Sequence, residues 1–491
     1  SKNVINLGAV SVGGNVTGGQ GTATNDNKVN LEGTAVNGVI SGGNNATSGN
    51  TLTVKGANTA GNITGFQNLT FDVESATAAP MLTLGGATTL DWNAIHSTGK
   101  KTGRIVLLQN TAGLSFNGTY TGLKTTNDAD DKTEFNIDTD SPATPTQVIS
   151  ESYKYRDQKD LVTPSFDPSS AYGGISKVGN STRENEITVN GSYTNVYGGH
   201  TDGTGTAKLG EYKDNSYKNT VNLSGGTVSD TVYGGYTTAA AGKTWENTVN
   251  IEGGSAANVV GAKSAGNATR NTVNVEKDLA TANIIGGKAA GGTSTAGIAE
   301  ENTVNLDHVT VTGDVTGGQG ATLANKNVVN MDNAAVTGTV KAAATIGAGN
   351  TLTVKGTNRA GNIAGVQRVS FNVSGASSAN TLLTLTDGAV TDLDWSAVET
   401  KGSSTNKINL LTHTNANNDK LLHIEHYNGV KTGRDTDDTT EFNIDTDTHE
   451  AEAQHVVSES YRYRGQTERV EMDGNLYGGV SKAGNATHDN K

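Results

Sequence analysis

Two acidic stretches carry the side chains most able to bind a metal ion. Residues 127–140 read "NDADDKTEFNIDTD", and residues 433–447 repeat them as "GRDTDDTTEFNIDTD". Carboxylates are the ligands that Ca²⁺ prefers, but neither stretch has the spacing of an EF-hand or the "GGxGxD" repeat of calcium-binding solenoids. Solvated loops are therefore the favoured interpretation, weak calcium binding is the alternative, and no other cofactor is expected. The candidate ligands are Asp128, Asp130, Asp131, Asp435, Asp437 and Asp438.

Four tyrosines each directly precede a Gly-Gly pair. A repeating fold would bring such residues to one corner of successive coils, as a stripe that stacks on sugar rings or on itself. Stacking between the tyrosines is the favoured interpretation, and glycan contact stays open. The four residues are Tyr172, Tyr197, Tyr233 and Tyr477.

The other ionisable residues do not form a pattern typical of an enzyme. A strand would place His423 and His426 on opposite faces, which separates them as metal ligands. A catalytic site is normally unique, whereas the acidic residues here are scattered or repeated. We therefore expect no enzyme and no catalytic residue, with a polysaccharide lyase or hydrolase as a distant alternative.

The composition limits the kind of fold that these residues can build. The chain has 491 residues, of which 64 are Gly, 33% are hydrophobic and 5% are aromatic, which is too lean for a compact globule. With no cysteine, it has no thiol chemistry and no disulfide. A net charge of −13 without a basic block argues against nucleic acid as a partner, and no apolar run is long enough to insert into a membrane.

A short strand motif recurs ten times, from "NVINL" at Asn3 to "NTLTV" at Asn350. Side chains alternate between the two faces of a strand, so the apolar pair points inward and the leading Asn shares that direction. Stacked copies would join these amides in a ladder of hydrogen bonds along the axis. The predicted ladder contains Asn219, Asn247, Asn271, Asn302 and Asn327.

A second signature follows the motif, as in "VSDTVYGG" from Val228 and "VTGDVTGG" from Val311. Its glycines suit a corner between two short strands, so each coil would hold about three strands around a narrow core. The predicted fold class is all-β, a parallel β-helix or β-solenoid. A helical fold conflicts with the period-two pattern, and an antiparallel sandwich gives no reason for one motif to recur in regular order.

A longer period divides the chain into blocks. Residues 51–73 return at 351–373 as "TLTVKGTNRAGNIAGVQRVSFNV", and each copy is followed by a segment without the short motif. We expect two less regular β-rich inserts between solenoid blocks, and, because both ends cut through the repeat, a segment of a longer protein. The expected domains are coils at 1–90, an insert at 91–171, coils at 172–390, a second insert at 391–476 and the next block from 477–491.

The stretch "NTVNLSGGTVSDTVYGG" from Asn219 and its relatives resemble the passenger repeats of autotransporter-type adhesins of Gram-negative anaerobes. The resemblance implies a right-handed β-helix, exported through an outer-membrane barrel and displayed outside the cell for adhesion or matrix building. The implied partners are surface glycans or proteins of host or bacterium, or the chain itself. The alternative is a segment of a long self-assembling extracellular filament.

Overall fold

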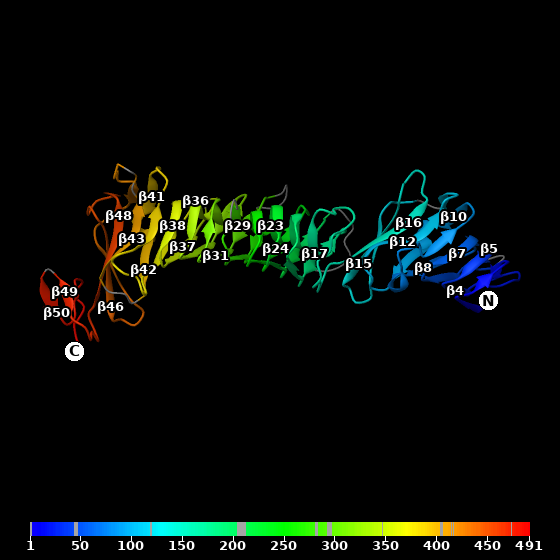
Figure 1. The fold of residues 1–491 in the computed structure, drawn as a ribbon, viewed down its shortest axis with the longest axis horizontal. Coiled ribbons are helices and arrows are strands. Elements are labelled where there is room, and N and C mark those ends of the chain that lie inside the picture. The colour runs from blue at the N-terminus through cyan, green and yellow to red at the C-terminus, as the bar shows by residue number, and fades with distance from the viewer. Residues whose placement is uncertain are drawn as a thin grey trace. The chain divides into compact units, whose positions relative to one another are not determined.

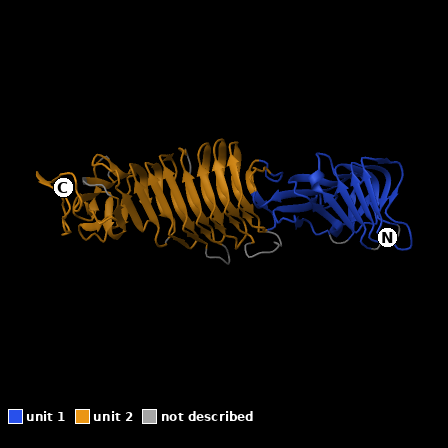
Figure 2. Cartoon of the chain, turned by 90° about the horizontal axis from the view of Figure 1, so that it is seen from below, with its two compact units in different colours: residues 1–157, 164–168, 174–178 blue, residues 158–163, 169–173, 179–491 orange. Residues whose placement is uncertain are grey.

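The computed structural model describes two compact units, coloured separately in Figure 2. Unit 1 comprises residues 1–157, 164–168 and 174–178, and unit 2 comprises residues 158–163, 169–173 and 179–491. Within them the structure describes residues 2–43, 48–117, 120–203, 213–279, 283–291, 297–345, 347–402, 406–413, 415, 417–472 and 474–491.

The chain is an all-β parallel β-solenoid of about 15 turns, which confirms the predicted fold class. Figure 1 shows its strands stacked one coil after another within each unit. The only helical segments among the described residues are three short 3₁₀ turns, including η2 (Trp92–Ala94) and η3 (Trp395–Ala397). None of the described residues forms a helix with the length and apolarity needed to cross a membrane.

Unit 1 stacks two long parallel sheets and one short parallel pair, β10 (Thr88–Asp91) with β13 (Leu114–Asn117). The first contains β1 (Val4–Gly8), β4 (Lys28–Glu32), β6 (Thr51–Lys55), β8 (Asn68–Asp72) and β11 (Ile95–Thr98). The second contains β2 (Ser11–Val12), β3 (Val16–Thr17), β5 (Ala35–Ser41), β7 (Asn58–Thr64), β9 (Leu82–Leu84) and β12 (Gly103–Asn110). Identical positions of the motif pair in register, as Val29 with Leu52 and Leu31 with Val54.

Unit 2 stacks three parallel sheets, one for each side of the coil. Sheet 1 holds the Asn motif in β19 (Glu186–Val189), β22 (Thr220–Leu223), β25 (Thr248–Ile251), β28 (Thr272–Val275), β31 (Thr303–Asp307), β35 (Val328–Asp332), β37 (Thr351–Lys355), β39 (Arg368–Asn372) and β42 (Val398–Lys401). Sheet 3 contains only short strands, β18 (Thr182–Arg183), β21 (Ser216–Tyr217), β24 (Thr244–Trp245), β27 (Ala268–Thr269), β30 (Ile298–Glu300) and β34 (Leu323–Asn325).

Sheet 2 carries the second signature and its glycines. Its parallel strands are β17 (Ala171–Ser176), β20 (Tyr193–Thr201), β23 (Thr227–Thr237), β26 (Ser255–Ser264), β29 (Asn283–Ala289), β33 (Val315–Gly320), β36 (Ala335–Ala343), β38 (Asn358–Ala364), β40 (Thr381–Leu385) and β43 (Asn406–His413). A Cβ at Gly234 would lie 2.3 Å from the carbonyl oxygen of Gly261, so only glycine permits this approach of neighbouring coils.

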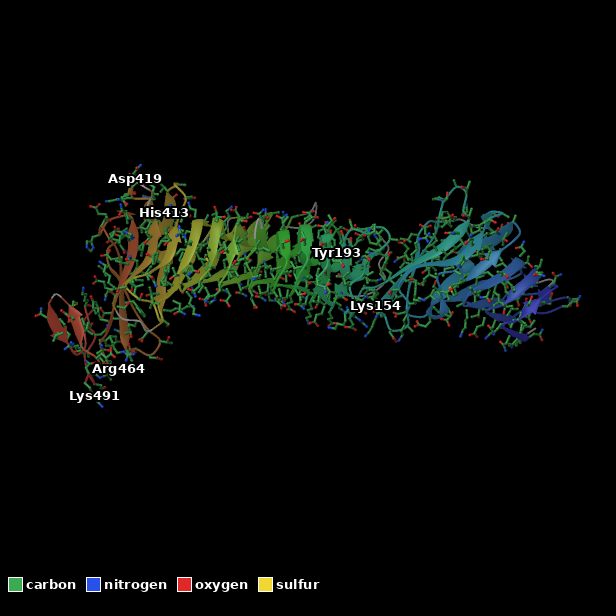
Figure 3. All side chains as sticks on the ribbon, in the orientation of Figure 1. Lys154, Tyr193, His413, Asp419, Arg464 and Lys491 are labelled. Carbon is green, nitrogen blue, oxygen red and sulfur yellow. The ribbon has the colours of Figure 1, made fainter. Side chains whose placement is uncertain are left out.

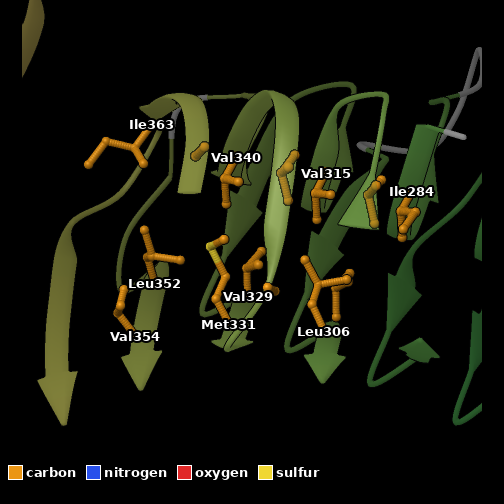
Figure 4. Close-up of a cluster of buried hydrophobic side chains, with 14 of the residues drawn as sticks. Ile284, Leu306, Val315, Val329, Met331, Val340, Leu352, Val354 and Ile363 are labelled. Carbon is orange, nitrogen blue, oxygen red and sulfur yellow. The ribbon is translucent and has the colours of Figure 1, made fainter. Parts of the chain in front are cut away.

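The inward apolar residues form one continuous core in unit 2. Figure 4 shows Val329 and Met331 of one coil beside Leu352 and Val354 of the next, with Val340 facing them from sheet 2. Their exposed fractions are 1% or less, and each fully buried Val or Leu contributes roughly 1.5–3 kcal/mol. Many polar and charged side chains cover the outward faces of the same strands (Figure 3).

Parallel pairing continues into both segments expected as inserts, 91–171 and 391–476. There β12 pairs in parallel with β9, and β43 pairs in parallel with β40, without the Asn motif. Beyond β12 and β43 these sheets continue with antiparallel strands, β16 (Gln147–Lys154) and β48 (His455–Arg462). These strands pair with the hairpins β14 (Lys124–Asn127)–β15 (Thr133–Thr139) and β45 (Lys431–Arg434)–β46 (Thr440–Thr446).

Candidate functional site

The five predicted ladder asparagines are consecutive members of one buried chain of hydrogen bonds. Asn219 donates from Nδ2 to Oδ1 of Asn247 at 2.9 Å and from its backbone N–H to the same oxygen at 3.1 Å. The pattern repeats with 2.9 Å Nδ2–Oδ1 distances through Asn271 and Asn302 to Asn327. All five side chains are fully buried, so they bind coil to coil and are not available to a ligand.

The ladder extends beyond the predicted residues and has a defined end. Asn185 donates to Asn219 at the start, and Asn350 donates to Oε1 of Gln367 at 2.8 Å at the finish. In unit 1 the backbone N–H of Asn50 likewise donates to Oε1 of Gln67. A glutamine therefore closes the ladder in both units, at the same position of the long repeat.

A second, outer ladder lies on the solvent side of sheet 1. Asn250 donates to Asn222 at 2.8 Å, Asn305 donates to Asn274 at 2.7 Å, and the bonds between them are similar. These asparagines were not predicted to form a ladder, although the "NTVNV" motif has Asn at both positions. Both ladders stabilise the stacking of coils.

A left-handed corner precedes the buried ladder, and its charges alternate in sign. The residue before each ladder Asn from Asn185 to Asn327 has a positive φ between 50° and 57°. Arg270 Nη2 lies 3.0 Å from Glu246 Oε1, and Lys326 Nζ lies 3.4 Å from Glu301 Oε1. The corner residues are, in order, Glu184, Lys218, Glu246, Arg270, Glu301 and Lys326.

Three of the four predicted tyrosines stack on one another. The ring centroids of Tyr172 and Tyr197 are 4.8 Å apart, and those of Tyr197 and Tyr233 are 5.2 Å apart and nearly parallel, at 5°. Tyr477 instead lies at the end of β50 (Asn475–Tyr477), which pairs with the antiparallel strand β49 (Val470–Met472), and is 37% exposed. The stack thus uses the ring faces for contacts between coils.

A second aromatic row lies beside the tyrosine stack. His200 and Tyr236 stack at 5.0 Å, and Lys263 Nζ lies 5.3 Å from the Tyr236 ring. Burial raises the pKa of both Tyr233 and Tyr236, so these phenols stay neutral at ordinary pH. The two rows form one aromatic ridge on sheet 2.

The six candidate calcium ligands lie in or beside hairpin turns, where several already have partners. Asp128 Oδ1 accepts the backbone N–H groups of Lys132 at 2.7 Å and Thr133 at 3.0 Å, and Asp435 does the same in the second hairpin. Although burial opposes ionisation, these donors lower the pKa of Asp435. The remaining candidates make the contacts Lys100–Asp130, Tyr155–Asp131, Tyr463–Asp438 and Arg464 with the carbonyl of Asp437.

One group of three side chains, separate from these aspartates, has metal-binding geometry. Asp394, Glu425 and His426 bring their donor atoms within 4.8 Å of one another, the only such trio among the described residues. His426 Nδ1 lies 3.1 Å from Asp394 Oδ2, while His423 contacts Glu452, so the two histidines do not share a site. Glu425 and His426 are exposed, and the cross-strand partner of Asp91 in unit 1 is Asn117 rather than Glu.

A buried glutamate that was not among the predicted site residues anchors each insert. Glu441 is 0% exposed, and its carboxylate accepts the Ser481 hydroxyl at 2.6 Å and the Lys482 backbone N–H at 2.9 Å. Glu134 accepts Ser176 and Lys177 in the same way. Burial opposes ionisation of Glu441, but these donors hold its pKa below the usual value. The repetition of "EFNIDTD" at Glu134 and Glu441 was the sequence feature that could have indicated these two glutamates.

No protein-family model matches the chain, and neither the curated proteins nor the solved structures contain a significant match. The functional interpretation therefore depends on the asparagine ladders, the aromatic ridge and the anchored inserts.

Proposed function

We propose that this chain is a non-catalytic extracellular repeat protein, a β-solenoid stalk displayed on a bacterial surface for attachment or for building a matrix. The observation that supports this proposal is the uninterrupted asparagine ladder, which runs from Asn185 to Gln367 in unit 2. Each coil is stabilised by hydrogen bonds to its neighbours, so a stack of coils resists bending and local unfolding. Such a scaffold presents the same outward positions many times.

Two features of the composition favour a role outside the cell. Without cysteine, no disulfide can lock the chain before it crosses an outer membrane. Its outward strand positions are rich in Asn and Thr, which keep a long surface hydrated at modest charge. Multiple weak contacts along such a surface add up through avidity.

Adhesion is measured with beads that carry the purified chain in one orientation. The beads flow over mucin-coated, fibronectin-coated and bare surfaces, and detachment is recorded against shear. We expect stronger retention on at least one coated surface than for beads carrying the heat-unfolded chain. Equal detachment from all surfaces would rule out the adhesive role.

Negative-stain electron microscopy across a concentration series tests the alternative role as a filament. Separate rods of constant length at every concentration support a stalk. Fibres that lengthen with concentration favour a self-assembling filament, and compact particles contradict both.

A further inference from the structure

A groove of about 1020 Å³ opens on sheet 3 of unit 2. Its floor is formed by outward side chains of the short strands β18, β21, β24 and β27, together with the left-handed corner residues that follow them. The residues that matter for binding are Arg183, Tyr217, Lys218, Trp245, Glu246 and Arg270.

An aromatic pair occupies the centre of the groove. The Tyr217 and Trp245 rings stack with centroids 4.2 Å apart and planes 8° apart. Arg183 Nη1 donates to the Tyr217 hydroxyl at 2.9 Å, which fixes the phenol at one end. On the other side Trp245 pairs in register with the short Thr269, so the groove continues past the indole.

This aromatic pair departs from the repeat. Both rings stand two residues before a ladder Asn, a position that holds Asn25, Thr269, Glu300 and other non-aromatic residues in the remaining described coils. Solenoid stacking therefore does not require an aromatic side chain there. Two such residues on adjacent coils are a local addition to the scaffold, as expected for a binding site.

The groove is positive although the chain is strongly negative. Among the described residues, its lining contains five basic and three acidic side chains, a net of two positive charges, against −13 for the whole chain. Lys218 and Arg270 contact Glu246 from either side at 4.0 and 3.0 Å, yet their side chains remain 52% and 54% exposed. Their charged groups can therefore reach a ligand in the groove.

We propose that this groove binds an acidic polysaccharide whose sugar rings carry carboxylates. The partly exposed indole of Trp245, which stacks on the buried Tyr217 ring, offers apolar surface to the C–H groups of a sugar ring. The basic side chains pair with carboxylates, and Glu246 with its acidic neighbours accepts sugar hydroxyls. A DNA strand fits less well, because it lacks the sugar hydroxyl groups that the three acidic side chains would accept. Binding at the groove does not depend on where the chain is located.

The test uses titration calorimetry of the whole chain with a galacturonic acid hexamer, a neutral galactose hexamer and a single-stranded DNA 12-mer. We expect the acidic hexamer to bind at least tenfold more tightly than either other probe. Trp245→Ala and Arg270→Gln each weaken binding at least tenfold, whereas Trp245→Phe retains it. Tyr236→Ala, in the separate aromatic ridge, is the matched control and leaves binding unchanged.

Tryptophan fluorescence provides a second measurement. Trp92 and Trp395 are buried, so a ligand-induced change in emission reports on Trp245. Circular dichroism and thermal unfolding establish that each variant is folded. Equal affinity for the acidic and neutral hexamers, tighter binding of DNA, or unaltered affinity in folded Trp245→Ala would each overturn the proposal. None of these outcomes bears on adhesion to the coated surfaces above.

Discussion

Replacing one ladder asparagine should destabilise several coils of unit 2. The Asn247 carboxamide accepts two hydrogen bonds from Asn219 and donates to Asn271 Oδ1, to the Ser216 carbonyl and to the Trp245 carbonyl. Asn247→Ala removes all five and leaves buried groups on both neighbouring coils without these partners. A buried polar group that loses its hydrogen bond costs about 1–3 kcal/mol, so we expect a loss of about 3–5 kcal/mol.

The matched control is Asn250→Ala in the same strand. Asn250 belongs to the outer ladder and is half-buried, so water replaces its amide partners after substitution. We expect this change to cost less than about 1 kcal/mol. The two variants remove the same chemical group from one coil and differ in burial.

The assay is native-state hydrogen exchange followed by mass spectrometry, because a chain of two units need not unfold in one step. Peptides that cover β22, β25 and β28 report the free energy of opening on both sides of the substitution. Equal and small effects of Asn247→Ala and Asn250→Ala would refute the conclusion that the buried ladder holds the coils together.

Three further outcomes follow from the structure. Since the pKa of Glu441 is depressed in the folded state, its contribution to stability is present above the unfolded pKa, near 4.3, and is lost as pH falls. Thermal unfolding should therefore show weaker acid sensitivity in Glu441→Gln than in the wild type. Glu301→Lys places three cations in a row at the corner, which should cost about 1 kcal/mol, and 0.5 M salt should largely remove this loss in a melting experiment. Because Asp128 and Asp435 accept backbone N–H groups in their hairpins, chelation by EDTA should leave the melting temperature unchanged, and a drop of several degrees would instead indicate bound calcium.

The alternation of inward and outward residues in the strand motif was enough to predict most of the fold. In "NTVNL", the parity of Asn219 with Val221 and Leu223 predicts an inward amide, and the structure contains the ladder that follows from it. The left-handed corner was not predicted, because a charged residue such as Lys218 gives no sign of a positive φ. The parallel pairing of β12 and β43 inside the expected inserts was not predicted, because these strands join β9 and β40 without the motif.

The groove was not predicted because its residues come from different coils. Tyr217 and Trp245 are distant in sequence, and their rings meet only because the loops between them bring Asn219 and Asn247 into register. Neither Tyr217 nor Trp245 belongs to a sequence motif that recurs along the chain. Their contact depends on the stacking of coils, which a search along the chain does not measure.

In a solenoid, each coil must make the same contacts with its neighbours. A residue that makes such a contact should therefore recur from coil to coil. The ladder asparagines, the corner charges and the paired glycines of sheet 2 all recur over many coils. A feature present on only two coils, such as the Tyr217–Trp245 pair, has no such explanation from packing alone. Departure from the repeat is therefore the better indicator of binding in this protein, and the stacked tyrosines, which continue over three coils, fit a structural role more closely.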